Sequence, residues 1–231
     1  MTSSPDETKA RFQAKLGDNF GELFYYCHSE WCSLWVLWRQ YENLFVHYGE
    51  QRIDLLNECG SQFFRTVQDK FFEATLLRLC KLTDRSKIFG KRTLTVRSFY
   101  KHMSSREQKK QMHSLIDDVK EKTAFARDWR DNAISHNNYE HRTDPKVELA
   151  HASVEKVQDA ISALHNIFQY VGSEFMDTDM ADWVRTPLND EMATIQMLFH
   201  GRIAWEESRD KARAGIQPMR REPDWVLKRR D

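Results

Sequence analysis

Arg130, Asp131 and His136 are the residues of this 231-residue chain whose types and spacing best suit a chemical step. An arginine guanidinium can hold a phosphate through paired N–H donors, and a histidine can remove or deliver a proton near neutral pH. RNA carries its own nucleophile, the 2′-hydroxyl, so this pair is sufficient in principle to cleave RNA with no metal ion and no cofactor. Asp131 directly follows the arginine and is placed to orient Arg130 or His136. These three residues are our candidate catalytic set.

Arg130 and His136 do not point the same way on a straight α-helix. Six residues at about 100° each separate them by roughly 240° around the axis. Two arrangements remain: the helix ends near Ile134, where polar residues follow, or the two side chains meet counterparts from a second copy across a dimer interface. Arg127 lies one turn before Arg130, and we expect it to pair with Asp131 four residues further on.

Simpler roles are also consistent with these residues. On an ordinary helix, Arg130 would be a surface cation beside an acidic neighbour, and His136 would interact with the last carbonyls of its helix. A basic run extends from Arg85 to Lys110, with Glu107 as its single acid. This run fits a solvated face, and it equally fits a substrate-binding patch that includes Arg85, Lys91 and Arg92.

The composition predicts a globular protein with no strong overall charge. Hydrophobic residues make up 40% of the chain, and 35 basic residues balance 35 acidic ones. A net charge of zero argues against coating long nucleic acid by bulk electrostatics, so a polyanion must meet a local patch. We expect a cytoplasmic protein with no membrane span, because charges interrupt every long apolar stretch. The cysteines lack metal-ligand spacing and are expected to be buried thiols; they are Cys27, Cys32, Cys59 and Cys80.

Apolar residues recur at steps of three and four along most of the chain, which is typical of amphipathic helices. We predict four core helices, over residues 20–45, 56–77, 105–133 and 147–175. Asp144 and Pro145 are expected to cap the last of them. Residues 83–104 break the pattern and predict a basic loop with a short helix over 95–103.

This pattern predicts the all-α class, as an up-and-down helical bundle with no convincing strand. The bundle is expected over residues 18–176, after a flexible segment at 1–17. A C-terminal extension should cover residues 177–231, with a helix over 189–213 and a loosely ordered tail.

Arg130-x5-His136, preceded by Arg127-Asp128-Trp129, resembles the R-x(4–6)-H motif of HEPN domains. The segment 77–84, Leu-x-Leu-Cys-Lys-Leu-Thr-Asp, is similar to the abortive-infection branch related to the AbiU phage-resistance proteins. The resemblance covers roughly residues 20–175. It implies a HEPN-like bundle, a homodimer that brings two motifs together, and metal-independent RNA cleavage in phage defence. It also implies that Arg127 and the basic loop hold the RNA backbone, with an antitoxin or regulatory protein as a further partner.

Two other classes remain open. The first is a non-catalytic HEPN-like module that binds RNA, a nucleotide or a partner protein in the same groove. The second is a structural or regulatory dimer, in which Trp31, Trp35 and Trp38 form the interface. We favour a core position for these tryptophans, because apolar stripes at helical spacing are usually buried.

Overall fold

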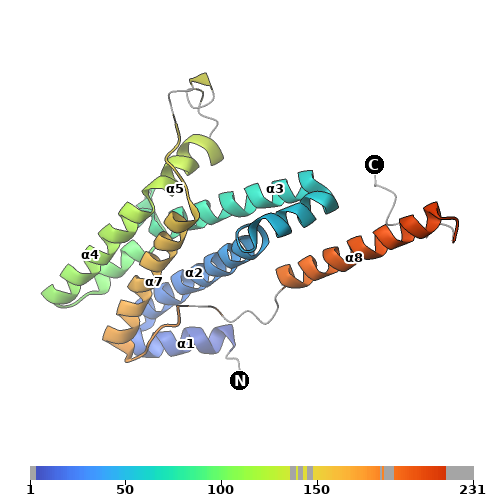
Figure 1. The fold of residues 1–231 in the computed structure, drawn as a ribbon. Coiled ribbons are helices and arrows are strands. Elements are labelled where there is room, and N and C mark those ends of the chain that lie inside the picture. Colours follow the sequence, from blue (N-terminus) through green and yellow to red (C-terminus); the bar gives the residue numbers. More distant parts are fainter. Residues whose placement is uncertain are drawn as a thin grey trace. The chain divides into compact units, whose positions relative to one another are not determined.

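The computed structural model describes residues 4–135, 139, 143–144, 148–182, 184 and 190–216, and these are mostly helical. The all-α class is therefore confirmed (Figure 1). The α-helices are α1 (Pro5–Leu16), α2 (Asp18–Phe45), α3 (Gly49–Thr83), α4 (Arg106–Lys122), α5 (Ala124–Trp129), α7 (Val154–Met176) and α8 (Asp190–Arg213). A 3-10 helix, η1 (Val96–His102), a π-helical turn, η2 (Arg130–Ile134), and a small hairpin of β1 (Lys87–Ile88) with β2 (Lys91–Arg92) complete the described elements.

The chain forms two compact units, and both α2 and α3 contribute to each of them. The first unit comprises Met1–Tyr41 and Asp69–Thr186, and the second comprises Glu42–Gln68 and Pro187–Asp231. The second unit contains α8, which spans the stretch predicted to be helical in the C-terminal extension. The candidate site residues that the structure describes all lie in the first unit.

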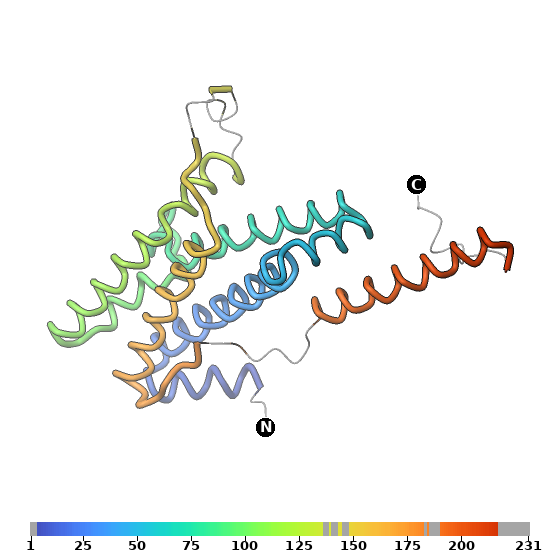
Figure 2. The backbone as a smooth tube through the Cα atoms, in the orientation of Figure 1, coloured from blue at the N-terminus to red at the C-terminus, as the bar shows by residue number. Residues whose placement is uncertain are grey.

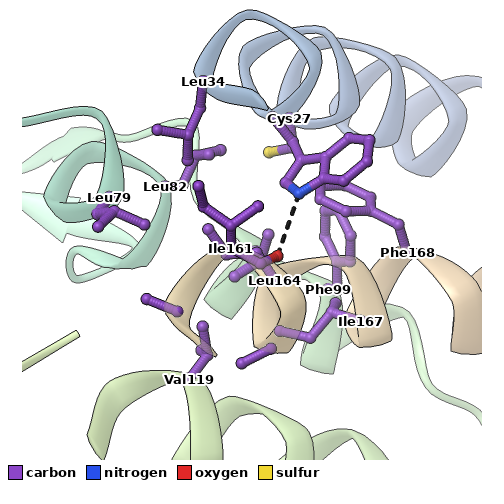
Figure 3. Close-up of a cluster of buried hydrophobic side chains, with 14 of the residues drawn as sticks. Cys27, Leu34, Leu79, Leu82, Phe99, Val119, Ile161, Leu164, Ile167 and Phe168 are labelled. Carbon is purple, nitrogen blue, oxygen red and sulfur yellow. Dashed lines mark hydrogen bonds between the residues drawn. The ribbon is translucent and has the colours of Figure 1, made fainter. Parts of the chain in front are cut away.

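The predicted stripe of α2 is buried in the core of the first unit. Phe24, Cys27, Trp31 and Leu34 are each at most 1% exposed, so the core position favoured for Trp31 is confirmed. The Trp31 indole N–H donates to the carbonyl oxygen of Ile161 on α7 at 3.3 Å, which satisfies its one polar group inside the core (Figure 3). Although α2 is rich in apolar residues, no helix among the described residues is long and apolar enough to cross a membrane.

Helices α4 and α7 lie side by side and run in opposite directions (Figure 2). Met112 and Val119 of α4 are fully buried, as their stripe predicts. From Val157 onward, the buried residues of α7 also follow the predicted stripe. Capping supports the α4 start, where Ser105 and Gln108 form a reciprocal capping box.

The predicted apolar face of α3 is wrong for its central part. Cys59 and Phe63 are exposed, and the buried apolar residues near the C-terminus of α3 are Leu76, Leu79, Cys80 and Leu82. Gly60 has non-helical backbone angles and interrupts the helix, so one continuous stripe does not describe both sides of the kink. The expectation of a buried thiol consequently fails at Cys59.

The predicted start of the last core helix is also wrong. Helix α7 begins at Val154, and its N-cap is Ser153 rather than Asp144. The backbone of Ala150 is engaged elsewhere: its carbonyl accepts from the Trp129 indole at 2.8 Å, and its N–H donates to Asp128 at 2.7 Å. These tertiary hydrogen bonds compete with helix formation and hold residues 148–153 in a non-helical path along α5.

His28 on α2 generates a prediction about pH. It packs between Phe24, Trp31 and Phe168, and burial lowers its pKa to about 4, with smaller contributions from His165 and Arg11. A lowered folded-state pKa means that the unfolded chain takes up the proton first, so stability should fall as the pH drops from about 6.5 towards 4. His28→Leu should reduce the loss between pH 7 and pH 5 by up to about 2 kcal/mol.

Urea denaturation of both proteins at the two pH values measures this difference. Burial also lowers the pKa values of His102 and His165, so the variant should keep a residual dependence. Equal losses of unfolding free energy in the two proteins would show that His28 does not titrate in this range.

Candidate functional site

Arg130 is held by two carboxylates from different parts of the chain. Its Nη1 donates to both oxygens of Asp84, each at 2.9 Å, and its Nε donates to Oδ1 of Asp131 at 2.7 Å. Asp84 directly follows the end of α3, whereas Arg130 begins η2, so this contact joins residues 46 positions apart. The side chains of Arg130 and Asp84 are 24% and 21% exposed, so the pair lies at the surface but is shielded on one side.

These contacts fix both the charge and the direction of the guanidinium. The hydrogen bond to Asp131 raises the pKa of Arg130, burial opposes it, and the bond to Asp84 adds to the rise. The group is therefore a permanent cation. With Nε and Nη1 engaged, Nη2 has no hydrogen-bond partner among the described residues.

The backbone changes geometry at the motif. Residues Arg130–Ile134 form a π-helical turn, closed by the Ser135 N–H donating to the Arg130 carbonyl at 2.8 Å. The π turn ends at Ile134, and Ser135 is a bend, so the helix stops where the first of the two predicted arrangements places its end. The 240° separation calculated for an ideal α-helix does not apply to this wider turn. His136 lies outside the described residues, so its position relative to Arg130 remains a prediction.

Arg127 joins the C-terminal ends of two helices. Its Nη2 donates to the Thr83 hydroxyl at 2.7 Å and to the Thr83 carbonyl at 3.1 Å. Its Nη1 donates to the Thr123 hydroxyl at 2.9 Å and to the Lys120 carbonyl at 3.2 Å. A cation at the carbonyl ends of α3 and α4 also complements their dipoles. Burial lowers the pKa of Arg127, the direction expected for a cation drawn in among helix ends.

The structure thus corrects one predicted pair. Asp131, expected to pair with Arg127, pairs instead with Arg130. The hydrogen bonds of Arg127 are made to protein groups, and its predicted contact with substrate stays a prediction.

A second set of contacts fixes the turn that precedes the motif. Asp128 accepts from the Asn132 amide at 2.9 Å and from the Ala150 N–H, while Trp129 donates to the Ala150 carbonyl. Trp129 also packs edge-on against Phe72 of α3, with ring centroids 5.8 Å apart. The two residues before Arg130 are therefore tied to neighbouring segments, and Asn132 of the π turn is bonded back to Asp128.

The predicted substrate-binding cations lie on the hairpin that follows Asp84. Arg85, Lys91 and Arg92 are all exposed, the last two on β2. The Thr95 hydroxyl lies 2.9 Å from the carbonyl oxygens of both Leu82 and Asp84, so the base of the hairpin is attached to the segment that holds Arg130. Among the described residues, these three cations share no hydrogen-bond or ion-pair partner with Arg130.

Asp84 and Thr83 are the site residues that the sequence analysis did not identify. Both end the segment 77–84 whose resemblance to the abortive-infection branch was noted, so the signal was present. Their partners are more than forty positions away, at 44 for Thr83 with Arg127 and 46 for Asp84 with Arg130. Spacing along one helix cannot reveal contacts of this kind.

Arg127 generates a stability prediction. Arg127→Met keeps much of the apolar stem but removes four charged hydrogen-bond contacts, so we expect a loss of about 2–4 kcal/mol in unfolding free energy. The matched control is Arg78→Met, since Arg78 pairs with Glu30 at 3.0 Å and both side chains are largely solvated. That control should cost less than about 1 kcal/mol. Chemical denaturation of the two variants makes the comparison, and equal losses would contradict a structural role for Arg127.

Comparison with known proteins identifies the family of the chain. The HEPN family described as AbiU2 matches residues 17–193, which is most of the chain. No curated protein and no solved structure gives a significant match. The match contains the end of α3, all of α4 and α5, the π turn and α7, and therefore every residue that fixes Arg130. The chain belongs to the HEPN superfamily, in its abortive-infection AbiU2 branch.

Proposed function

We propose that the protein is an endoribonuclease that cleaves RNA without a metal ion and acts in phage defence of the abortive-infection or toxin type. The observation that carries the proposal is the geometry of Arg130, whose fork is held on two sides while Nη2 has no hydrogen-bond partner in the part of the chain that the structure describes. We propose that Nη2 binds a phosphate oxygen. Guanidinium groups fixed in this way stabilise charge that develops on a phosphate without reorganising during the reaction.

In the proposed reaction, the RNA 2′-oxygen attacks the adjacent phosphorus and the bond from phosphorus to the 5′-oxygen breaks. The attacking hydroxyl loses one proton, and the leaving oxygen gains one. The products are a 2′,3′-cyclic phosphate and a 5′-hydroxyl end. Two proton transfers on opposite sides of the phosphate suit two histidines, so we propose that His136 from each copy of a homodimer supplies one of them.

Local charge balance assigns distinct roles to the surrounding residues. Asp84 and Asp131 together carry two negative charges, which Arg130 and Arg127 offset. The immediate surroundings of Arg130 are thus close to neutral, and attraction of RNA requires cations further out. Arg85, Lys91 and Arg92 are exposed and suited to that task. In this proposal Asp131 and Asp84 orient Arg130, and Arg127 supports the helix ends behind it.

The test is cleavage of mixed RNA substrates in excess EDTA, with the chemistry of the new ends determined. Wild type should cleave, Arg130→Ala should lower the rate by about 10²–10³ through lost charge stabilisation, and His136→Ala by about 10²–10⁴ through lost proton transfer. Arg130→Lys keeps the charge but not the fork and should recover little activity. Arg78→Ala, far in sequence from the motif, is the control for general damage. A His136→Ala protein that cleaves at the wild-type rate would refute the mechanism.

The second candidate is a non-catalytic HEPN module that binds RNA, a nucleotide or a partner protein. The double salt bridge of Arg130 is the observation that favours it, because a cation paired with two carboxylates is also a common structural tie. Retained RNA binding with no cleavage by wild type, in the presence of its cellular trigger, would support this reading. An antitoxin or regulatory protein is the partner we propose to restrain either activity.

A further inference from the structure

Phe89, at the tip of the hairpin between β1 and β2, is fully exposed. Its backbone has a positive φ of 49°, and the next residue, Gly90, has a φ of 78°. Two successive positive values are the geometry of a tight hairpin turn in which asparagine, aspartate or glycine is preferred. A bulky side chain is disfavoured in that backbone region. Neither burial nor turn preference therefore explains an aromatic residue at this position.

The residues around Phe89 form a cluster of exposed basic side chains. Arg85, Lys87, Lys91 and Arg92 are all exposed, and residues 85–95 contain no acidic residue. The chain as a whole has no net charge, so this cluster is a local feature and not a general property of the surface. An exposed ring among cations is the combination that single-stranded nucleic acid requires, with stacking for a base and charge for phosphates.

The hairpin is anchored at its base. Lys87 pairs with Arg92 and Ile88 with Lys91 across the strands, and the Thr93 N–H donates to the Ser86 carbonyl at 3.2 Å. The Thr95 hydroxyl contacts the carbonyls of Leu82 and Asp84, as described above. The segment that carries Phe89 thus directly follows Asp84, the residue that orients Arg130. The hairpin is therefore joined to the candidate phosphate site.

The protein surface beside the base of the hairpin is concave. A pocket of about 380 Å³ is lined by Arg92, Lys101 and His102, by residues of the hairpin base, and by α2 residues that include Tyr26 and Glu22. The Glu22 carboxylate pairs with Lys9 at 2.5 Å. Tyr26 is 40% exposed, and the Lys9 ammonium lies over its ring, 5.1 Å from the ring centroid. A nucleotide next to the one on Phe89 has both a cavity and cations available to it.

We propose that residues 85–92 form a finger that binds single-stranded RNA, with an unpaired base stacked on Phe89 and the flanking phosphates held by Lys87, Lys91 and Arg92. This inference rests on the proposed function, because it names the class of RNA which that site takes. We prefer RNA to a membrane as the partner because each strand of the hairpin has only two residues. Insertion of Phe89 into a bilayer would therefore carry the adjacent cations towards its interior.

The test uses the full-length chain and a short single-stranded 2′-O-methyl oligonucleotide of mixed sequence. The methyl group blocks the proposed nucleophile, so binding is measured without cleavage. The key variant is Phe89→Asn, which suits the positive φ. It should keep or raise the thermal midpoint while weakening binding by about 5- to 150-fold. Phe89→Trp should keep near wild-type affinity because it preserves a stacking face.

Salt dependence separates stacking from charge. Phe89→Asn should leave the slope of log affinity against log salt unchanged, whereas Lys91→Gln should reduce that slope by about 0.7 for one lost phosphate contact. Phe63→Ala is the matched control, since Phe63 is also an exposed phenylalanine, at 66%, but lies on α3 outside the basic cluster. It should bind as wild type does.

Unchanged affinity in Phe89→Asn would overturn the finger, as would equal weakening in Phe63→Ala. If Phe89→Asn lost binding to phosphatidylserine vesicles but kept its affinity for RNA, the finger would likewise be overturned in favour of a membrane contact. The outcome is separable from the proposed reaction: RNA cleavage by a protein whose Phe89→Asn variant binds normally removes the finger alone. Finger-dependent binding with no cleavage of unmodified RNA removes the nuclease alone.

Discussion

The end of α3 is attached to the α4–α5 segment by two arginines, and the candidate site depends on this attachment. Arg127 donates hydrogen bonds to the Thr83 hydroxyl and carbonyl, and Arg130 donates to the carboxylate of Asp84. The last carbonyls of a helix have no partners within it, so an arginine that reaches them both satisfies the backbone and positions the next residue. Arg127 thereby sets where Asp84 lies, and Asp84 sets where Arg130 points. Packing and candidate chemistry share a single network.

The π turn follows from the same arrangement. Asp128 and Trp129 bind the backbone of Ala150, while Arg130 is drawn towards Asp84, so successive side chains of one short stretch are held by different segments. A regular α-helix distributes consecutive side chains at fixed angles, and a local widening can accommodate contacts that those angles would not. In this protein the widening occurs over Arg130–Ile134, and it ends two positions before His136 in the sequence. Turns of this kind are frequent at functional sites, and here its cause can be assigned to named contacts.

The basic hairpin extends this network outward. It leaves the bundle directly after Asp84 and is fastened back to that residue by Thr95. Charges near Arg130 are balanced, so the surface that can attract a polyanion is displaced from the residue proposed to act on it. In the proposed function, exposed and salt-sensitive cations capture the RNA, and a half-buried, rigid guanidinium orients its phosphate. Phe89 at the tip is the residue for which we propose a contact that does not depend on charge.

Much of the helical architecture followed from periodicity, because a helix with one buried face repeats its apolar residues at a fixed interval. The stripes of α2, α4 and α7 were predicted well, including the burial of Trp31 and Met112. The prediction failed at Cys59 and Phe63, where the Gly60 kink shifts the pattern, and at Asp144, where the contacts of Ala150 delay the helix. A kink and a competing tertiary hydrogen bond have no periodic signature.

The sequence by itself determined the all-α class, indicated the family by resemblance and marked Arg130 as a candidate, since these depend on local spacing and residue type. Only the tertiary structure decided that Asp84 and not a helical neighbour holds Arg130 from the other side, that Asp131 pairs with Arg130 rather than Arg127, and that Arg127 joins two helix ends. These outcomes depend on where α3 ends relative to α5. That distance is set by the packing of the whole core, and no short stretch of sequence encodes it.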